Sequence, residues 1–363
     1  MKTNMGVIGT GNIARIHAEG VNAAEDIAEL YAVCDIDKDK ADEFAEKHGA
    51  AKVYTDYRKM LDDDGLDAVC VSTPSFTHAR ISADAIEAGK PVLCEKPAGG
   101  SLKEMDLIAQ ALDEYGGTFN SVFQWRYGRG VSLFRKLQKR NITGPILWAR
   151  SDTLWMRKPE YYADSWRGTW EGEKGGALIT LAIHAIDTLC SILARPKSVY
   201  SNADTLNHDI ETDDVSSSVI RLEDGSIANI NVTSCSHTDM SSVKIICGNV
   251  LAESNEHPYS TSSWPWSFTS SDNNIQEQID QIVNEADREN EGRLHHSQMR
   301  DFIVCLQEGR EPPVTITEAR RSLELITGIY KSAFTGEPVE FPIHRDDPFY
   351  SSMNADSYTE WRR

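Results

Sequence analysis

The sequence lacks any long, uninterrupted hydrophobic run. Its first apolar segment, NMGVIGT at residues 4–10, is interrupted by glycines after only a few residues. A signal peptide needs an apolar stretch of about 7–15 residues and a membrane helix needs about 20, so neither fits. We therefore expect a cytoplasmic protein that does not bind membranes.

The sequence also lacks paired cysteines. Its seven cysteines occur singly, mostly inside apolar stretches such as DAVCVST at 67–73, and no CxxC pair occurs. An odd number of scattered thiols is typical of reduced core residues and supports neither a disulfide framework nor a zinc site. The histidines, including His295 and His296, show no spacing with carboxylates or thiols that suggests a metal, so we predict no metal site.

Positive charge is scarce. The chain has 37 lysines and arginines against 56 aspartates and glutamates, a formal net charge of -19 and a pI near 4.9. Such a chain repels phosphate backbones at long range, which argues against binding to nucleic acids or anionic membranes. The remaining composition, 40% hydrophobic and 26% charged, is typical of a globular protein, and a length of 363 residues suggests two domains.

A glycine-rich turn follows the first apolar run. Residues Gly9-Thr10-Gly11-Asn12-Ile13-Ala14 match GxGxxA and lie between a short strand and a segment with apolar residues at helical spacing. In this pattern the first glycine permits the turn, the second lets the backbone approach a pyrophosphate, and helix N-terminal amides bind the anion. We predict a dinucleotide site, with a purely geometric turn as the alternative.

An aspartate lies near the end of the next apolar run, ELYAVCDID at 29–37. Asp35 is spaced from the glycines so that its carboxylate can accept hydrogen bonds from the adenosine ribose hydroxyls and repel a 2'-phosphate. No arginine follows immediately to bind such a phosphate, so NAD is favoured over NADP. The alternative role for Asp35 is to cap the helix predicted at 38–49.

Two further strands, LDAVCVSTP at 66–74 and KPVLCEKP at 90–97, flank the helical segment ISADAIEAGK at 81–90. Alternating short apolar strands and amphipathic helices predict an α/β fold with a doubly wound parallel sheet. Ligands of such sheets bind at the carboxyl ends of the strands. The residues expected there are Gly9, Asp35, Ser72, Thr73, Pro74, Glu95, Lys96 and Pro97.

These segments resemble the glucose-fructose oxidoreductase, inositol dehydrogenase and MocA family (Gfo/Idh/MocA). The resemblance extends to FQWRY at 123–127, to residues 165–189 and to residues 295–333. It implies a Rossmann domain at 1–122 and an α+β domain at 123–363 with a large open, mainly antiparallel sheet. The inner face of that sheet would cover the nicotinamide and its outer face would form homodimers or homotetramers. Two residues in the matching segments, His78 and Gln124, join the cofactor-binding candidates.

The resemblance also implies two catalytic residues. In such enzymes the lysine of the EKP triplet, here Lys96, and a histidine on the first long helix of the second domain, here His184, flank the reacting hydroxyl. The family commonly has Asp-x-Gly-x-His on that helix, whereas this sequence has Thr180 in place of the aspartate. The replacement puts in doubt a substrate contact or a carboxylate-to-histidine coupling from that position.

The chemistry of the residues supports the same assignment. Oxidation of an alcohol requires a base within hydrogen-bond reach of the hydroxyl, and histidine suits this role with an unperturbed pKa of about 6.5. We assign His184 as the base and Lys96 as the cation that stabilises the alkoxide. The alternatives are a structural buried histidine and a solvated surface lysine. One face of a helix predicted over 177–193 would carry Thr180, His184, Asp187 and Thr188. Asp187 then either orients the histidine ring or faces solvent.

Residues 124–170 are rich in aromatic side chains and arginines, a composition that fits sugars because rings pack on CH faces and guanidinium groups bind hydroxyls. Many of these side chains will belong to the core or rim. The substrate-binding candidates are Arg126, Tyr162, Trp166, Arg167, Thr180 and Asp187.

Further strands are predicted at 145–154, 197–206, 215–222 and 226–234. The Ser- and Asn-rich stretch 253–275, with Trp264-Pro265-Trp266, reads as a loop at the substrate mouth or subunit interface or, as we favour slightly, a surface excursion.

The predicted function is NAD-dependent oxidation of a secondary hydroxyl of a sugar, sugar derivative or polyol, or reduction of the ketone. One alternative is a glycosidase that uses tightly held NAD for transient oxidation and elimination. Another is a non-enzymatic ligand sensor, against which the presence of both Lys96 and His184 argues.

Overall fold

The computed structural model describes residues 2–259, 261–263, 266–286 and 294–354. It divides into two units, Met1–Gln124 with Leu294–Arg320 and Trp125–Arg293 with Arg321–Arg363. The first break lies close to the boundary predicted after residue 122. Residues 294–320, which we had assigned to the second domain, pack with the first unit instead.

The first unit is built on a six-stranded parallel sheet, sheet A, in the order β3-β2-β1-β4-β5-β6. This order confirms the predicted doubly wound α/β fold. From β1 the chain adds β2 and β3 on one side, and it then crosses over to add β4, β5 and β6 on the other side. Such sheets bind ligands at this crossover between β1 and β4. The strands are β1 (Thr3–Ile8), β2 (Ala28–Cys34), β3 (Lys52–Tyr54), β4 (Ala68–Val71), β5 (Val92–Cys94) and β6 (Phe119–Ser121).

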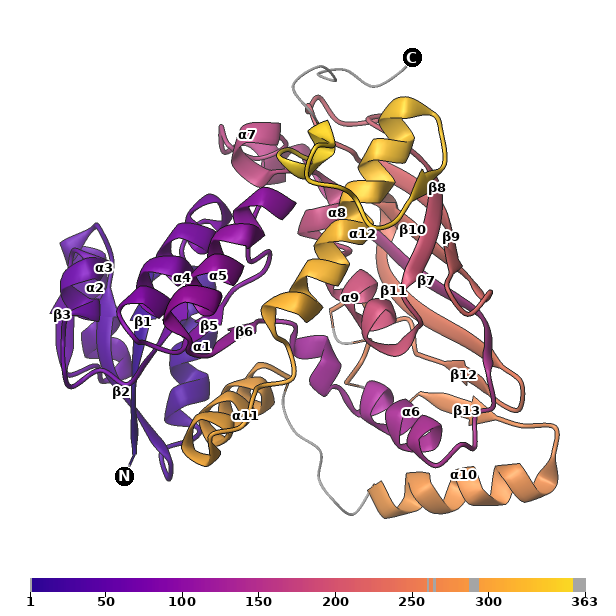
Figure 1. Ribbon diagram of the computed structural model, residues 1–363, viewed down its shortest axis with the longest axis horizontal. Coiled ribbons are helices and arrows are strands. Elements are labelled where there is room, and N and C mark those ends of the chain that lie inside the picture. Colours follow the sequence, from indigo (N-terminus) through magenta and orange to yellow (C-terminus); the bar gives the residue numbers. More distant parts are fainter. Residues whose placement is uncertain (1, 260, 264–265, 287–293, 355–363) are drawn as a thin grey trace. The chain divides into compact units, whose positions relative to one another are not determined.

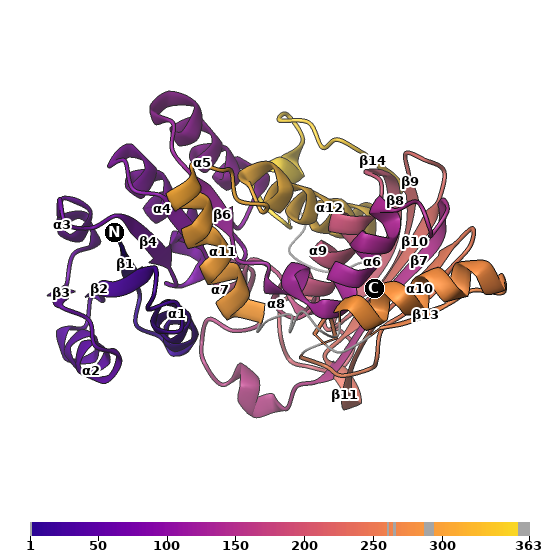
Figure 2. The same ribbon diagram turned by 90° about the horizontal axis from the view of Figure 1, so that it is seen from below.

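Helices cover both faces of sheet A. Figure 2 shows α1 and α2 on one side of the strands and α4 and α5 on the other. These connections give each buried strand an apolar layer above and below it. The helices of this unit are α1 (Asn12–Asn22), α2 (Lys38–His48), α3 (Tyr57–Leu61), α4 (His78–Glu87), α5 (Leu102–Tyr115), α11 (Leu294–Glu308) and the short η1 (Ser75–Thr77).

Helix α11 joins the first unit through its apolar face. Met299, Phe302 and Ile303, at helical spacing, are buried in the same core as Met5 of β1 and Ala18 of α1. The predicted division missed this return of the chain because the helical pattern alone does not say which sheet the helix covers.

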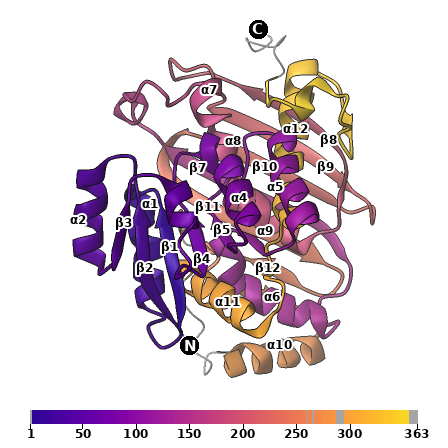
Figure 3. The ribbon, with the colours of Figure 1, turned by 60° about the vertical axis from the view of Figure 1, so that its left-hand side comes forward.

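The second unit contains an eight-stranded sheet, sheet B, in the order β13-β12-β11-β7-β10-β9-β8-β14. Figure 3 labels β7 to β12 of this sheet. Neighbouring strands are antiparallel except β7 and β10, which are parallel. The predicted large, mainly antiparallel sheet is thus confirmed. Its strands are β7 (Ile146–Met156), β8 (Pro196–Asp204), β9 (Val215–Leu222), β10 (Ile227–Thr233), β11 (Cys235–Cys247), β12 (Leu251–Glu253), β13 (Ser267–Thr269) and β14 (Val339–Glu340).

One face of sheet B is packed and the other is not. Along β9, Ser216, Ser218, Ile220 and Leu222 are buried, whereas Val219 between them is 50% exposed. Figure 1 shows α9 and α12 on the same side of this sheet. The helices are α6 (Arg129–Lys139), α7 (Trp170–Glu173), α8 (Ala177–Thr180), α9 (Ile183–Ile192), α10 (Asn273–Ala286) and α12 (Ile316–Thr335), with short turns η2 (Gln124–Tyr127), η3 (Pro159–Tyr162) and η4 (Pro348–Tyr350).

The continuous helix predicted over 177–193 is wrong. The chain forms α8 and then α9, and Trp170–Thr180 is bent by 56° relative to Ile183–Ile192. Between them the amide of Ala182 donates to the carbonyl of Ala177, five residues back, which breaks the regular helical register. Among the described residues no single helix has the length and apolar composition of a membrane span. This bent pair meets those two criteria only when its parts are combined.

The surface excursion predicted for 253–275 is wrong at Trp266. This side chain is 4% exposed, its indole nitrogen donates to the carbonyl of Thr261 at 3.0 Å, and its ring packs against Gly130 of α6. Part of the segment forms the edge strand β13 and the start of α10. Trp264 and Pro265 lie outside the described residues.

Candidate functional site

The predicted cofactor-binding residues all belong to the first unit and gather at the carboxyl ends of the sheet A strands. The turn Gly9–Ile13 follows β1, Asp35 follows β2, Ser72–Pro74 follow β4, and Glu95–Pro97 follow β5. His78 begins α4, and Gln124 begins η2, which follows β6.

The two glycines of the turn differ in their surroundings. Gly9 has φ +90°, and a Cβ there would lie 2.8 Å from the Thr73 amide nitrogen, so this glycine is required by the protein's own packing. Gly11 has φ -70°, and a Cβ there would meet no atom within 4 Å. Gly11 is the N-cap residue of α1, and no side chain caps this helix end. An open approach to an uncapped helix N-terminus is suited to an anionic ligand.

Asp35 stabilises this turn through hydrogen bonds to Thr10. One carboxylate oxygen accepts hydrogen bonds from the amide and the hydroxyl of Thr10, each at 2.9 Å, and the other accepts from the Asp37 amide at 3.0 Å. Partial burial disfavours the charged form, but these hydrogen bonds outweigh burial and lower the pKa of Asp35. The N-cap of α2 is Asp37, so the alternative role of Asp35 as the helix cap is wrong.

A buried ion pair supports the segment that carries Lys96. His17 Nε2 lies 2.8 Å from Glu95 Oε1, and Glu95 Oε2 accepts a hydrogen bond from the Lys96 amide at 3.0 Å. The two paired residues are only 3% and 6% exposed. Burial alone would raise the pKa of Glu95, but the hydrogen bond and charge of His17 lower it to about 2. Burial alone would lower the pKa of His17, but its contacts with Cys70 and Glu95 raise it. Both shifts favour the ionised form of the pair.

The role of His17 was missed in the sequence. Its position on the buried face of α1 marks it as a core residue, but its partner lies 78 residues away. A histidine on the buried face of the first helix, followed later by the glutamate of EKP, is the signal that could have found the pair.

His78 ties the ends of two neighbouring strands together. Its side chain is buried, with Nδ1 at 2.7 Å from the Pro97 carbonyl and Nε2 at 2.8 Å from the Thr73 carbonyl. Ser72 similarly donates to the carbonyl of Gly9 at 2.9 Å. Both side chains thus contact the backbone of the predicted cofactor site and position it.

His184 lies at the start of α9 in the second unit. Its ring stacks on that of Trp125, with centroids 5.7 Å apart and an interplanar angle of 24°. Trp125 is 3% exposed, whereas His184 is partly exposed. The hydroxyl of Thr180, at the end of α8, donates to the Gly176 carbonyl at 2.8 Å. The stacked tryptophan restricts the rotation of the histidine ring.

Arg126 and Asp187, both predicted to bind substrate, bind each other. Two guanidinium nitrogens of Arg126 donate to the two Asp187 oxygens, each at 2.7 Å, and the Ser322 hydroxyl adds a third hydrogen bond at 2.8 Å. Asp187 is 0% exposed, so the alternative that it faces solvent is wrong. The bidentate pair joins η2 to α9 inside the second unit.

The other substrate candidates form an arginine and tyrosine cluster. The Arg167 guanidinium lies over the rings of Tyr161 and Trp166, at 4.2 and 4.4 Å from their centroids, and donates to Glu173 at 3.1 Å. Trp166 is 48% exposed. The Tyr162 hydroxyl donates to Ser234 at 3.2 Å, and its ring lies 4.9 Å from that of His208.

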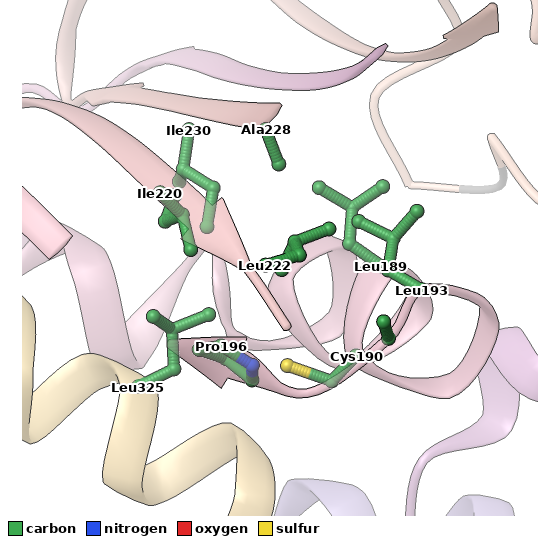
Figure 4. A pocket seen from close by; sticks show the side chains of 10 residues that line it. Leu189, Cys190, Leu193, Pro196, Ile220, Leu222, Ala228, Ile230 and Leu325 are labelled. Atoms are coloured by element: carbon green, nitrogen blue, oxygen red, sulfur yellow. The ribbon is translucent and has the colours of Figure 1, made fainter. Parts of the chain in front are cut away.

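An apolar pocket lies between α9, α12 and sheet B (Figure 4). Every side chain that lines it is aliphatic or a cysteine, including Leu189, Ile220 and Leu325. A sugar hydroxyl would lose its hydrogen bonds there, so this pocket does not fit the predicted substrate.

Comparison with protein families agrees with this geometry. Residues 3–123 match the oxidoreductase family with an NAD-binding Rossmann fold, and residues 131–249 match the GFO/IDH/MocA C-terminal domain. The chain belongs to the GFO/IDH/MocA family. The predicted resemblance is thereby confirmed, and the first unit is an NAD-binding Rossmann domain.

Relatives in this family include named dehydrogenases. Myo-inositol 2-dehydrogenase of Thermotoga maritima is 34% identical over 142 residues, which are 39% of this chain and only 41% of that protein. The scyllo-inositol 2-dehydrogenase (NAD(+)) of Bacillus subtilis is 25% identical over 358 residues, covering 93% of this chain and 96% of that one. The structure of the WlbA dehydrogenase from Bordetella pertussis, in complex with NADH and UDP-GlcNAcA, has a TM-score of 0.83 at 26% identity and covers 95% of this chain and 100% of that one.

Proposed function

We propose that this GFO/IDH/MocA protein is an NAD-dependent dehydrogenase that oxidises a secondary hydroxyl of a sugar, sugar derivative or polyol, or reduces the corresponding ketone. The observation that carries the proposal is the open approach to Gly11 at the uncapped start of α1, in a Rossmann domain of an oxidoreductase family. The names of the relatives support the substrate class.

In the proposed reaction, NAD held at the glycine turn and by Asp35 would supply the acceptor for the hydride that leaves the substrate carbon. Residues of the chain remove the proton of the hydroxyl and stabilise the alkoxide that forms. We assign His184 to accept it from the hydroxyl and Lys96 to donate a hydrogen bond to the developing alkoxide. The stacking of Trp125 on His184 supports this role, because a base with restricted rotation needs less reordering. The buried carboxylate of Glu95, which holds the Lys96 amide, likewise limits where that lysine can reach.

The experiment is a substrate screen with NAD and NADP that follows absorbance of the reduced cofactor. It should include inositols, sugars, sugar acids and glycosides. Because the WlbA structure contains UDP-GlcNAcA, nucleotide-linked sugar acids belong in the first panel. Cleavage of a glycoside without net NADH formation would support the glycosidase alternative and overturn the proposal of a simple dehydrogenase.

Variants then test the two residues on the best substrate. We expect His184→Ala to leave NADH binding nearly intact and to lower kcat by about 10²- to 10⁴-fold. Lys96→Met should lower kcat by a similar factor. If both residues act on one hydroxyl, the loss of kcat in the double variant should be far smaller than the product of the two single losses. His257→Ala and Lys103→Met are the matched controls, since both side chains are exposed. A wild-type kcat in His184→Ala would rule out the assigned base.

We also propose a cytoplasmic homodimer or homotetramer that associates through the outer face of sheet B. The exposed apolar side chains on that face include Tyr200, which lies opposite Val219. Ile227 and Ile246 are also exposed, and both lie opposite the partly buried Trp148. Exposed apolar groups that adjoin across strands favour association. Light scattering of the purified chain at several concentrations measures the oligomeric state, and a monomer throughout would refute the proposal.

A further inference from the structure

Three side chains of metal-binding type meet in the second unit, although the sequence suggested no metal site. They are His208 in the loop after β8, Asp214 just before β9, and Cys235 at the start of β11. His208 Nδ1 lies 3.2 Å from Asp214 Oδ2 and 3.6 Å from Cys235 Sγ, and all three atoms lie within 4.8 Å of one another. The side chains of His208 and Asp214 are 5% and 0% exposed.

The orientation of His208 is that of a metal ligand. Its Nε2 lies 2.9 Å from the carbonyl oxygen of Arg157, which can only accept, so Nε2 carries a proton and donates. In the neutral ring Nδ1 then directs its lone pair toward Asp214 Oδ2 and Cys235 Sγ. Metal-binding histidines typically have their second nitrogen held in this way by a carbonyl or carboxylate. Two electron-rich atoms 3.2 Å apart repel each other unless a cation or a proton lies between them.

Asp214 is fixed before any ligand arrives. Its carboxylate accepts hydrogen bonds from the amides of Leu206, Asn207 and His208, at 2.8 to 2.9 Å. These bonds set the conformation of the loop and hold the carboxylate facing His208. Little side-chain ordering would therefore oppose the binding of a cation.

Two of the three ligand-atom separations match those of zinc ligands, and the third, between Asp214 Oδ2 and Cys235 Sγ, lies within 4.8 Å. Zinc lies about 2.0–2.1 Å from nitrogen, about 2.0–2.2 Å from oxygen and about 2.3 Å from sulfur. At the tetrahedral angle these bonds place nitrogen and oxygen roughly 3.3 Å apart, and nitrogen and sulfur roughly 3.6 Å apart. The structure has 3.2 and 3.6 Å. A carboxylate and a thiolate together also neutralise a divalent charge, which a buried site requires.

We propose that His208, Asp214 and Cys235 form a site for a thiol-binding divalent cation, with Zn²⁺ as the first candidate. On binding, the Cys235 S–H bond breaks, the proton leaves to solvent and the thiolate donates its electron pair to the metal, with no change in oxidation state. The fourth position is taken by water. The metal ties the loop that carries His208 to β11, next to the ring of Tyr162. The competing arrangement is a protonated His208 paired with Asp214 beside a neutral thiol.

The test uses the full chain, treated with a chelator and then titrated with Co²⁺ as a coloured substitute for Zn²⁺. We expect one equivalent to bind, with a thiolate-to-cobalt charge-transfer band and the intense visible bands of four-coordinate cobalt, and Zn²⁺ to displace it. Cys235→Ser should lose the charge-transfer band, and His208→Ala should lose saturable one-to-one binding. Cys247→Ser is the matched control, because Cys247 is a buried thiol at the other end of the same strand.

Each other outcome overturns the proposal. If Co²⁺ binds without a charge-transfer band, or if the band persists in Cys235→Ser, these residues do not form the site. Circular dichroism checks that the variants fold. Should His208→Ala fail to fold, the comparison of Cys235→Ser with Cys247→Ser decides alone. No step requires substrate or NAD, so failure here leaves the proposed dehydrogenase function untouched.

Discussion

Replacing Gly11 with valine tests the cofactor site without disturbing the packing of the protein. Gly11 has φ -70°, a conformation open to any residue, and no atom lies within 4 Å of a Cβ built there. The new side chain therefore enters only the space through which a pyrophosphate would approach the α1 amides. The expected cost to folding is that of a poorer helix cap, about 1 kcal/mol.

The loss of affinity should be much larger than the loss of stability. Hydrogen bonds from backbone amides to a charged group contribute about 1.5–3 kcal/mol each. If valine displaces the pyrophosphate from two such amides, the loss is about 3–6 kcal/mol, or about 10²- to 10⁴-fold in Kd for NADH. Fluorescence titration with NADH measures this loss, and urea unfolding measures stability on the same sample.

Gly9→Ala is the matched control, because it should show the opposite balance. With φ +90° and a Cβ 2.8 Å from the Thr73 amide nitrogen, alanine there strains the backbone. The positive φ alone costs about 1–2 kcal/mol, so Gly9→Ala should be less stable than Gly11→Val although its side chain is smaller. Undiminished NADH affinity in Gly11→Val would remove the turn from the cofactor site. If Gly11→Val failed to fold, the claim that the space around the Gly11 Cβ position is open would be refuted.

Three further predictions follow from individual contacts. Asp35→Ser should lower the ratio of kcat/KM with NAD to kcat/KM with NADP by a factor that corresponds to about 1–3 kcal/mol. A wild type that uses both cofactors equally would contradict the assignment of Asp35. Asp187→Asn removes the charge that Arg126 pairs with in the core, so the urea unfolding free energy should fall by about 3–5 kcal/mol, and a change below 1 kcal/mol would show that the pair matters little. The pKa of Glu95 is held down to about 2, so the stability that its pairing contributes is present above the unfolded-state pKa of about 4.3 and is lost as the pH falls through about 2. The stability gap between wild type and His17→Ala should therefore widen as the pH rises from about 2 to 5, and a constant gap in acid titrations would be inconsistent with an ionised pair.

The features that could be predicted from the sequence are those produced by local patterns. Four strands of sheet A, β1, β2, β4 and β5, are short apolar runs bounded by turns, and their parallel order follows from the helices between them. The three-residue strands β3 and β6, KVY and FNS, were not predicted because neither is an apolar run. The glycine turn was identified because Gly9 and Gly11 stand at a fixed spacing after a strand. The family resemblance predicted sheet B as a whole. Local alternation alone predicted its strands β7 to β10 but missed β11 to β14.

The features that could not be predicted depend on side chains that meet across long stretches of sequence. The break between α8 and α9 is one case. The Asp213 carboxylate accepts hydrogen bonds from the amides of Gly176 and Leu178, which precede it by 37 and 35 residues. These bonds fix the first turn of α8. Asp213 itself is held by the Tyr330 hydroxyl, 117 residues away. A helical periodicity plot contains none of these contacts, so it predicted a single continuous helix.

The same reasoning separates the groups that position the site from those that can contact a substrate. Arginine and carboxylate residues in a sugar-binding segment look equivalent in sequence, yet Arg126 and Asp187 are buried and satisfy each other. Their charges cannot also meet a hydroxyl without a large desolvation cost, because opening the pair would leave one of them unpaired in the core. Trp166 differs, since nearly half of its surface is exposed while Arg167 packs on its ring. If the second unit binds the proposed sugar or polyol, we therefore expect its selectivity to depend more on the exposed Trp166 and the partly exposed His184 than on the buried pair of Arg126 and Asp187.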